Sequence, residues 1–107
     1  MSEISAIAEG YEALRARLDG SSDDALFRVY MELAPLIGQI QGAVSAARRR
    51  AGEVPIEAAE QSLEALKTST RQVGLDIRLA SPAALRMGLE SALHHAGEAI
   101  HALQEVA

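Results

Sequence analysis

The chain has 107 residues, a formal net charge of -5 at neutral pH and no cysteine. This length supports one modest hydrophobic core, and the lack of cysteine excludes a disulfide framework and a thiolate metal site. Hydrophobic residues make up 49% of the chain, which argues against a disordered acidic tail. We therefore expect one helical domain over residues 1–107, for the reasons that follow.

Apolar residues recur at spacings of three and four in four successive segments, which is the pattern of helices with one buried face. The four stripes are Ile4, Ile7, Tyr11, Leu14 and Leu18; Leu26, Val29, Leu33, Leu36, Ile40, Ala43 and Ala47; Ile56, Ala59, Leu63, Leu66, Thr70, Val73, Ile77 and Ala80; and Leu85, Leu89, Ala92, Ala96, Ala99, Leu103 and Val106. Alanine, the best helix former, is frequent, and aromatic residues make up only 3%. We predict helices near residues 3–18, 23–50, 55–79 and 82–106.

Residues that start and stop helices lie between these stripes. Asp19-Gly20 is typical of a helix end, and Ser21 or Ser22 is suited to cap the next helix. Ser81-Pro82 is typical of an N-cap followed by the first helical residue, and Pro55 suits the first turn of the third helix. These signals support the four predicted boundaries.

Two segments conflict with uninterrupted helices. Pro35 lies inside the second predicted helix, where a proline removes a hydrogen bond and favours a kink. Thr68-Ser69-Thr70 and Gly74 are poor helix formers inside the third. Because the apolar stripe continues through both segments, we expect bending or fraying there rather than termination.

The connections between the predicted helices are short, so consecutive helices should be antiparallel neighbours. The fold class we predict is all-α, a four-helix antiparallel up-down bundle that oligomerisation could complete or extend. The motif Gly38-x-x-x-Gly42 suggests close contact between two soluble helices, because no segment is long and apolar enough to span a bilayer.

The second predicted helix carries an additional apolar stripe that widens its apolar arc to roughly 240° in its first half. This stripe consists of Phe27, Tyr30, Met31, Ala34 and Ile37. One interpretation is that the first and fourth helices cover it. The other is that a second protein chain covers it, in a homodimer or in a complex with a partner. We take these five residues as the candidate interface.

The last predicted helix carries the chain's candidate metal ligands. Glu90, His94, Glu98, His101 and Glu105 follow at spacings of four, four, three and four, within about 80° of one another. Glu98-x-x-His101 matches the Glu-x-x-His pair of ferritin-like di-iron bundles, and His94 is a possible further ligand. The stripe lies opposite the apolar stripe of this helix, so we expect a solvated face and no bound cofactor. A metal site at a subunit interface is the alternative.

Two families of small helical proteins are similar to this chain in size and helicity alone. The histidine phosphotransfer family has a Lys-Gly after its histidine, whereas His94 is followed by His95-Ala96-Gly97-Glu98 without lysine. Helical-hairpin secretion substrates of the WxG type carry a tryptophan, and this sequence has none. We therefore assign the chain to neither family, and the sequence shows no catalytic motif.

Charge gives an expectation about partners and location. Arg48, Arg49 and Arg50 lie at a predicted helix end, where cations are favoured, and neither half of the chain is basic. We therefore expect neither nucleic acid nor a membrane among its partners. Glu3 and Glu9 lie where a signal peptide has basic residues, so we expect a cytoplasmic protein.

Together these features predict a non-enzymatic protein–protein interaction module, such as a small helical regulator, adaptor or inhibitor. It is expected to self-associate through its second helix. The first alternative is a metal-binding helical-bundle protein or enzyme that uses Glu98 and His101 at a subunit interface. The second alternative is an exported helical effector.

Overall fold

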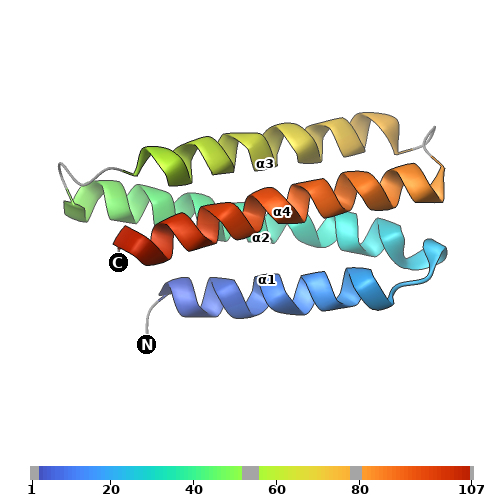
Figure 1. The fold of residues 1–107 in the computed structure, drawn as a ribbon, viewed down its shortest axis with the longest axis horizontal. Coiled ribbons are helices and arrows are strands. Elements are labelled where there is room, and N and C mark those ends of the chain that lie inside the picture. The colour runs from blue at the N-terminus through green and yellow to red at the C-terminus, as the bar shows by residue number, and fades with distance from the viewer. Residues whose placement is uncertain (1–2, 52–55, 78–80, 107) are drawn as a thin grey trace.

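The structure is a computed structural model that describes residues 3–51, 56–77 and 81–106 (Figure 1). These residues form helices throughout, apart from short connections: α1 (Glu3–Gly20), the 3₁₀ turn η1 (Asp23–Ala25), α2 (Leu26–Ala51), α3 (Glu57–Asp76) and α4 (Pro82–Val106). The fold is compact, with a radius of gyration of 14.1 Å and dimensions of 44 × 25 × 16 Å. The all-α prediction is confirmed for the described residues.

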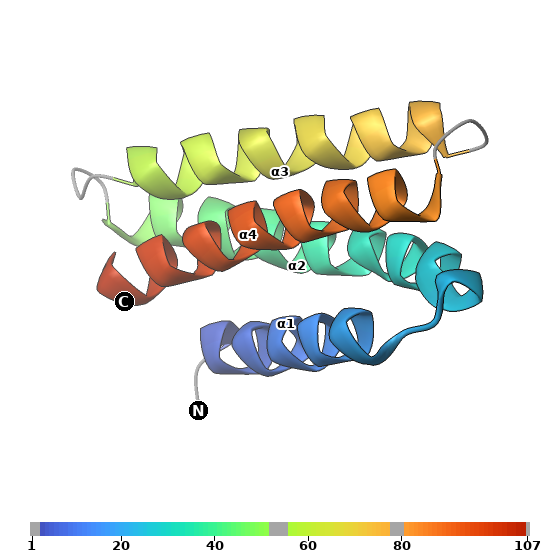
Figure 2. The same cartoon turned by 45° about the vertical axis from the view of Figure 1, so that its right-hand side comes forward.

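The four helices lie side by side along the long axis of the molecule (Figures 1 and 2). The direction of the chain reverses from each helix to the next (Figure 1). Helices α1 and α3 lie on opposite sides of α2 and α4, which also contact each other. Each face of α2 that points toward α1, α3 or α4 is therefore covered, and its remaining face is not.

The four predicted stripes form the hydrophobic core. All members of the first two stripes are buried, as are Ile56, Ala59, Leu63, Leu66, Val73, Leu89, Ala92, Ala96, Ala99 and Leu103 of the other two. Thr70, Ile77 and Leu85 are half-buried, while Ala80 and the side chain of Val106 lie outside the described residues. Burying one stripe from every helix removes apolar surface from water, which is the main force that holds the fold together.

Helices α3 and α4 pack closely because small residues line their contact. A Cβ atom added at Gly88 of α4 would lie 2.8 Å from Cγ2 of Val73 in α3. That distance is far below a van der Waals contact between carbon atoms, so this position requires glycine for the present helix separation. Ala84 and Ser91 of α4 lie beside Gly88 along the groove against α3.

The helix boundaries differ from the predicted ones at five ends, two of which are the ends of α1 at Gly20 and of α2 at Ala51. The second predicted helix starts as the η1 turn and becomes α-helical at Leu26, and the third runs from Glu57 to Asp76 rather than from 55 to 79. Ser22 occupies the cap position before η1 without a side-chain cap hydrogen bond. Ser21 instead donates its hydroxyl back to the carbonyl of Arg17 in α1. The predicted role of Pro55 lies outside the described residues.

The helix start predicted at Ser81-Pro82 is confirmed. Helix α4 begins at Pro82, and the backbone N–H of Ala84 donates to the Ser81 hydroxyl at 3.2 Å. This hydrogen bond satisfies one of the N–H groups that a helix start leaves without an internal partner.

Neither of the weak segments ends its helix. Helix α2 continues through Pro35, which lies on its exposed side, where the carbonyl that loses its helical partner can be hydrated. Helix α3 continues through Thr68–Thr70 and Gly74, and the Thr70 hydroxyl donates to the Leu66 carbonyl at 2.8 Å. That bond satisfies the hydroxyl within the helix, so the polar residue does not disrupt it.

Arg86 of α4 fixes the end of α1. Its guanidinium donates to the carbonyls of Leu18 and Ser21, both at 2.8 Å, and lies 3.8 Å from a carboxylate oxygen of Asp23. The Leu18 carbonyl also accepts the backbone N–H of Ser21 at 3.2 Å, and the carbonyl end of a helix carries partial negative charge, so the charged guanidinium there is favourable. Arg86 thereby ties the shortest helix, α1, to α4.

Candidate interaction surface on helix two

The structure separates the five predicted interface residues into two groups. Phe27 and Met31 are 53% and 56% exposed, and Ala34 is also exposed. Tyr30 and Ile37 are half-buried and pack against the core. The first group therefore faces solvent, and the second faces the interior of the bundle.

Tyr30 is covered by α3 rather than by the first or fourth helix. A Cβ atom added at Gly74 of α3 would lie 2.5 Å from the Tyr30 hydroxyl oxygen, so the tyrosine ring lies directly over that glycine. The Tyr30 ring also lies 6.1 Å from the ring of Phe27, at an angle of 44°. The Tyr30 ring thus lies beside the Phe27 ring, on its side toward the core, while Phe27 itself is exposed to solvent.

The uncovered side of α2 forms a continuous surface that we call the outer face of α2. It consists of the exposed residues Phe27, Met31, Ala34, Pro35, Gly38, Gly42 and Ser45. No residue from 33 to 47 is charged, although several of these positions face solvent. The exposed positions of the other helices include Glu9, Glu12, Arg15, Glu57, Glu64, Arg71, Glu90, Glu98 and Glu105. Apart from the exposed Arg28 beside Phe27, the outer face of α2 thus lacks the charged side chains that cover the other helices.

Gly38 and Gly42 are both on this outer face. A Cβ atom added at either glycine would meet no other atom within 4 Å in the described part of the chain. The two glycines therefore do not serve the packing of α2 against its own neighbours, in contrast to Gly88. Within residues 3–51, 56–77 and 81–106, no other helix makes the close contact that the motif suggests at Gly38 and Gly42.

The predicted metal ligands on α4 contact side chains one helical turn away instead of forming one cluster. Glu98 Oε1 lies 3.4 Å from His94 Nε2 and 3.2 Å from His95 Nδ1, while His101 Nε2 lies 3.1 Å from Glu105 Oε1. The structure therefore brings Glu98 to His94 and His95 and brings His101 to Glu105. These are contacts between residues one helical turn apart.

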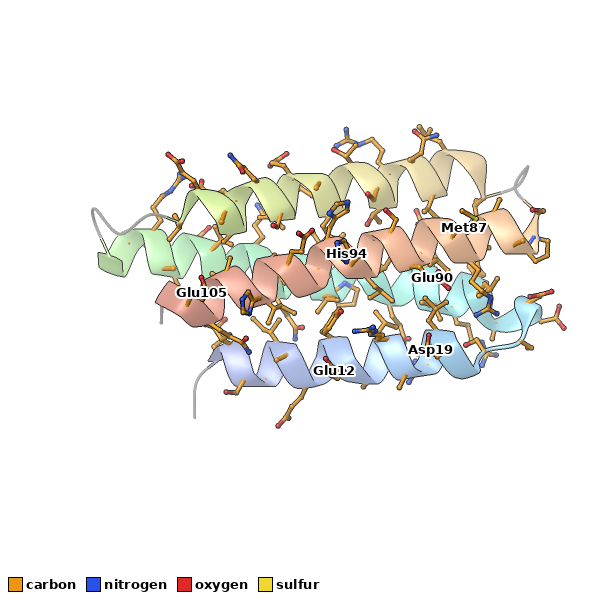
Figure 3. All side chains as sticks on the ribbon, viewed as in Figure 1. Glu12, Asp19, Met87, Glu90, His94 and Glu105 are labelled. Atoms are coloured by element: carbon orange, nitrogen blue, oxygen red, sulfur yellow. The ribbon has the colours of Figure 1, made fainter. Side chains whose placement is uncertain are left out.

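This stripe lies on the solvent side of α4. Figure 3 shows Glu90, His94 and Glu105 in order along the side of α4 that faces the viewer, and α2 lies behind it. The side chains of His94 and His101 are 71% and 73% exposed. Among the described residues, no group of three or more His, Asp or Glu side chains is arranged to hold a metal ion.

A polar groove of about 370 Å³ runs between α2 and α3, and it contains most of the basic residues that the sequence places near this end of α2. Arg48 forms an ion pair with Glu60, and Lys67 lies 3.7 Å from Glu64. These pairs compensate two of the three basic residues that line the groove, and the third is Arg49, so the groove keeps a single uncompensated cation. Arg49 is exposed and forms no ion pair with a described side chain.

Comparisons with known proteins return no relative: no protein-family model, no curated protein and no solved structure matches this chain. None of the helices in the described ranges has the length and apolarity needed to cross a bilayer. The functional assignment therefore depends on the surfaces of the chain itself.

Proposed function

We propose that this chain is a non-enzymatic protein–protein interaction module whose binding surface is the outer face of α2. The observation that supports this most strongly is the exposure of Phe27 and Met31 beside a helix surface that carries no charged residue from Leu33 to Ser45. Exposed apolar surface costs solvation free energy in a lone molecule, and contiguous patches of it mark protein interaction sites. Burial of this surface by another protein chain removes that cost.

The candidate interface is thereby narrowed. Phe27, Met31 and Ala34 are proposed to contact the partner, whereas Tyr30 contacts Gly74 of α3 and Ile37 packs against the core, so that both keep the outer face rigid. A rigid surface loses less conformational entropy on binding than one that must become ordered. The proposed module therefore presents a preformed helix surface.

The wider proposal concerns the fold and its setting. We propose that residues 1–107 form one domain, an antiparallel up-down four-helix bundle, which acts in the cytoplasm as a small regulator, adaptor or inhibitor. Its output is to occupy or organise a partner protein, including a second copy of itself. The four packed stripes and the reversal of direction in Figure 1 support this description.

Two methionines allow a matched test of the proposed surface. Met31 lies on the outer face of α2, and Met87 lies on α4 with 71% of its surface exposed. We expect Met31→Glu to weaken association, with itself or with a partner from native lysate, by tenfold or more, because it places a charge in a desolvated contact. Met87→Glu should leave association unchanged, and circular dichroism should show the same helix content in both.

The measurements are solution mass by sedimentation and co-purification from native lysate. Loss of association in Met31→Glu alone supports the proposal. A wild-type chain that associates with nothing, or an equal loss in both variants, contradicts it.

A further inference from the structure

We propose that the protein chain that covers the outer face of α2 is a second copy of this chain, packed α2 against α2 in antiparallel orientation about a two-fold axis. This inference rests on the proposed function and narrows it to one occupant and one geometry. The support comes from the placement of charge and of side-chain size along the outer face.

Charged residues of opposite sign lie at the two ends of the outer face. Five residues along this line are Asp24, Met31, Gly38, Gly42 and Arg49, at successive spacings of seven, seven, four and seven. At about 100° per residue, Met31, Gly38, Gly42 and Arg49 of α2 lie within about 40° of the helix circumference, and Asp24 lies in the η1 turn that precedes them. Asp24 and Arg49 are both exposed, and neither forms an ion pair with another side chain in the described ranges.

This charge arrangement is self-complementary in one orientation only. In an antiparallel pair centred midway between Asp24 and Arg49, each Asp24 faces Arg49 of the second copy, so two ion pairs form. In a parallel pair, Asp24 faces Asp24 and Arg49 faces Arg49, and both contacts are repulsive. No charged residue lies between Leu33 and Ala47, so the middle of the contact adds no charge repulsion in either orientation. The charges at the ends therefore select the antiparallel one.

The sizes of the side chains fit the same register. The pair Met31 and Gly42 has the same midpoint as the pair Asp24 and Arg49, so each exposed methionine faces the open space at Gly42 of the second copy. Gly38 lies beside the two-fold axis, where a missing side chain lets the two backbones approach closely. Large residues in one half of the face thus meet small residues in the other half.

The size of this contact predicts how strong the pairing is. From Asp24 to Arg49, η1 and α2 together extend about 37 Å, and a strip about 10 Å wide covers on the order of 400 Å² per copy. A standard stable interface buries about 800 Å² per partner. We therefore expect a concentration-dependent dimer rather than an obligate one.

Cysteine cross-linking tests both the occupant and the orientation, because the wild-type chain has no cysteine. Met31→Cys and Gly42→Cys variants each place one thiol on the outer face, at an exposed residue and at a glycine with open space around it. Under oxidising conditions, an equimolar mixture of the two should give a mixed disulfide at a yield at least tenfold above that of either variant alone. A mixture of Met87→Cys and Gly42→Cys is the matched control and should give none.

The outcomes separate this inference from the proposed function. Two results overturn the antiparallel dimer and leave the proposed function standing. The first is cross-linking between identical positions within each cysteine variant. The second is no cross-link at all, together with binding of the wild-type chain to another protein that Met31→Glu abolishes. Absence of any association that depends on Met31 overturns both.

A charge-reversal series provides an independent measurement. Asp24→Arg should weaken self-association several-fold, and adding Arg49→Asp to the same chain should restore it. Glu12→Arg, on the exposed side of α1, is the control for net charge. Equal weakening by Asp24→Arg and Glu12→Arg, without restoration by the second change, contradicts the pairing of Asp24 with Arg49.

Discussion

Tyr11 of α1 lies directly over Gly97 of α4. A Cβ atom added at Gly97 would lie 2.6 Å from the Tyr11 hydroxyl oxygen and 3.0 Å from its Cζ atom. The relationship is repeated between Tyr30 of α2 and Gly74 of α3, with a closest distance of 2.5 Å. Each tyrosine thus occupies the space left by a glycine on another helix. The two pairs differ in burial, because Tyr11 is 8% exposed and Tyr30 is only half-buried.

This difference predicts unequal effects of alanine at the two glycines. Gly97→Ala should lower the free energy of unfolding by about 1–2 kcal/mol, because displacing the buried Tyr11 ring outweighs the gain of about 1 kcal/mol in helix propensity. Gly74→Ala should change it by less than about 1 kcal/mol, because the Tyr30 ring can move toward solvent. Urea denaturation measures both values. A larger loss for Gly74→Ala contradicts the account of these contacts.

A second change tests whether the Tyr11 hydroxyl causes the clash. Tyr11→Phe removes the atom that lies nearest to an added Cβ at Gly97. We expect the double variant Tyr11→Phe with Gly97→Ala to lose less stability than the sum of the two single changes, by about 0.5 kcal/mol or more. Additive losses in this double-mutant cycle would show that the two positions do not interact.

Arg86 gives a prediction about the attachment of α1. Arg86→Met keeps much of the side-chain volume but removes the donors to Leu18 and Ser21, so it should lower the free energy of unfolding by about 1–3 kcal/mol. Arg86→Lys should recover part of this loss, because an ammonium group cannot reach both carbonyls with the geometry of a guanidinium. In Arg86→Met, the rate of amide hydrogen exchange should increase most at the C-terminal end of α1. Unchanged exchange there contradicts the capping role.

The sequence predicted the buried side of each helix but not the neighbour that each remaining side meets. Spacing alone placed Leu33, Leu66 and Leu89 in the core, because one apolar stripe per helix leaves a single way to bury it. Phe27 and Tyr30 are both apolar and only three residues apart, yet α3 covers one of them and not the other. Which of the two aromatic residues becomes covered depends on the side of α2 against which α3 packs.

The capping by Arg86 was also beyond sequence reasoning. Its acceptors Leu18 and Ser21 lie more than sixty residues earlier in the chain, and no local motif joins them. The N-cap at Ser81, in contrast, was predictable from sequence because its donor, Ala84, lies three residues away. The cytoplasmic setting and the identity of the partner stay predictions. Local signals fix local structure, and contacts across the fold require the packed arrangement.

The glycines of the outer face should separate folding from association. Gly38→Ala and Gly42→Ala should each raise the free energy of unfolding of the monomer, by about 0.5–1 kcal/mol, because open space surrounds both positions and alanine favours a helix. The same changes should weaken self-association, because they hold the two α2 helices apart. Urea denaturation at low concentration and sedimentation at high concentration measure the two effects. Stronger association in both variants argues against close contact at these glycines.

The stripe on α4 gives a prediction about metal. Because Glu98 pairs with His94 and His95 while His101 pairs with Glu105, we expect one equivalent of Zn²⁺ to leave the melting temperature unchanged. Protein purified without a histidine tag should contain less than one metal ion per chain. Stoichiometric metal that is lost in Glu98→Gln would instead support the metal-binding alternative.

The most direct test of the account is the methyl NMR spectrum of methionine as the protein concentration is raised. Met31 and Met87 are both exposed and lie on different helices, so the methyl group of each reports on one surface. We expect the Met31 signal to shift with concentration while the Met87 signal stays constant, because association buries the outer face of α2. A shift at Met87 with none at Met31, or constant signals while the solution mass increases, contradicts the claim that this face is where another chain binds.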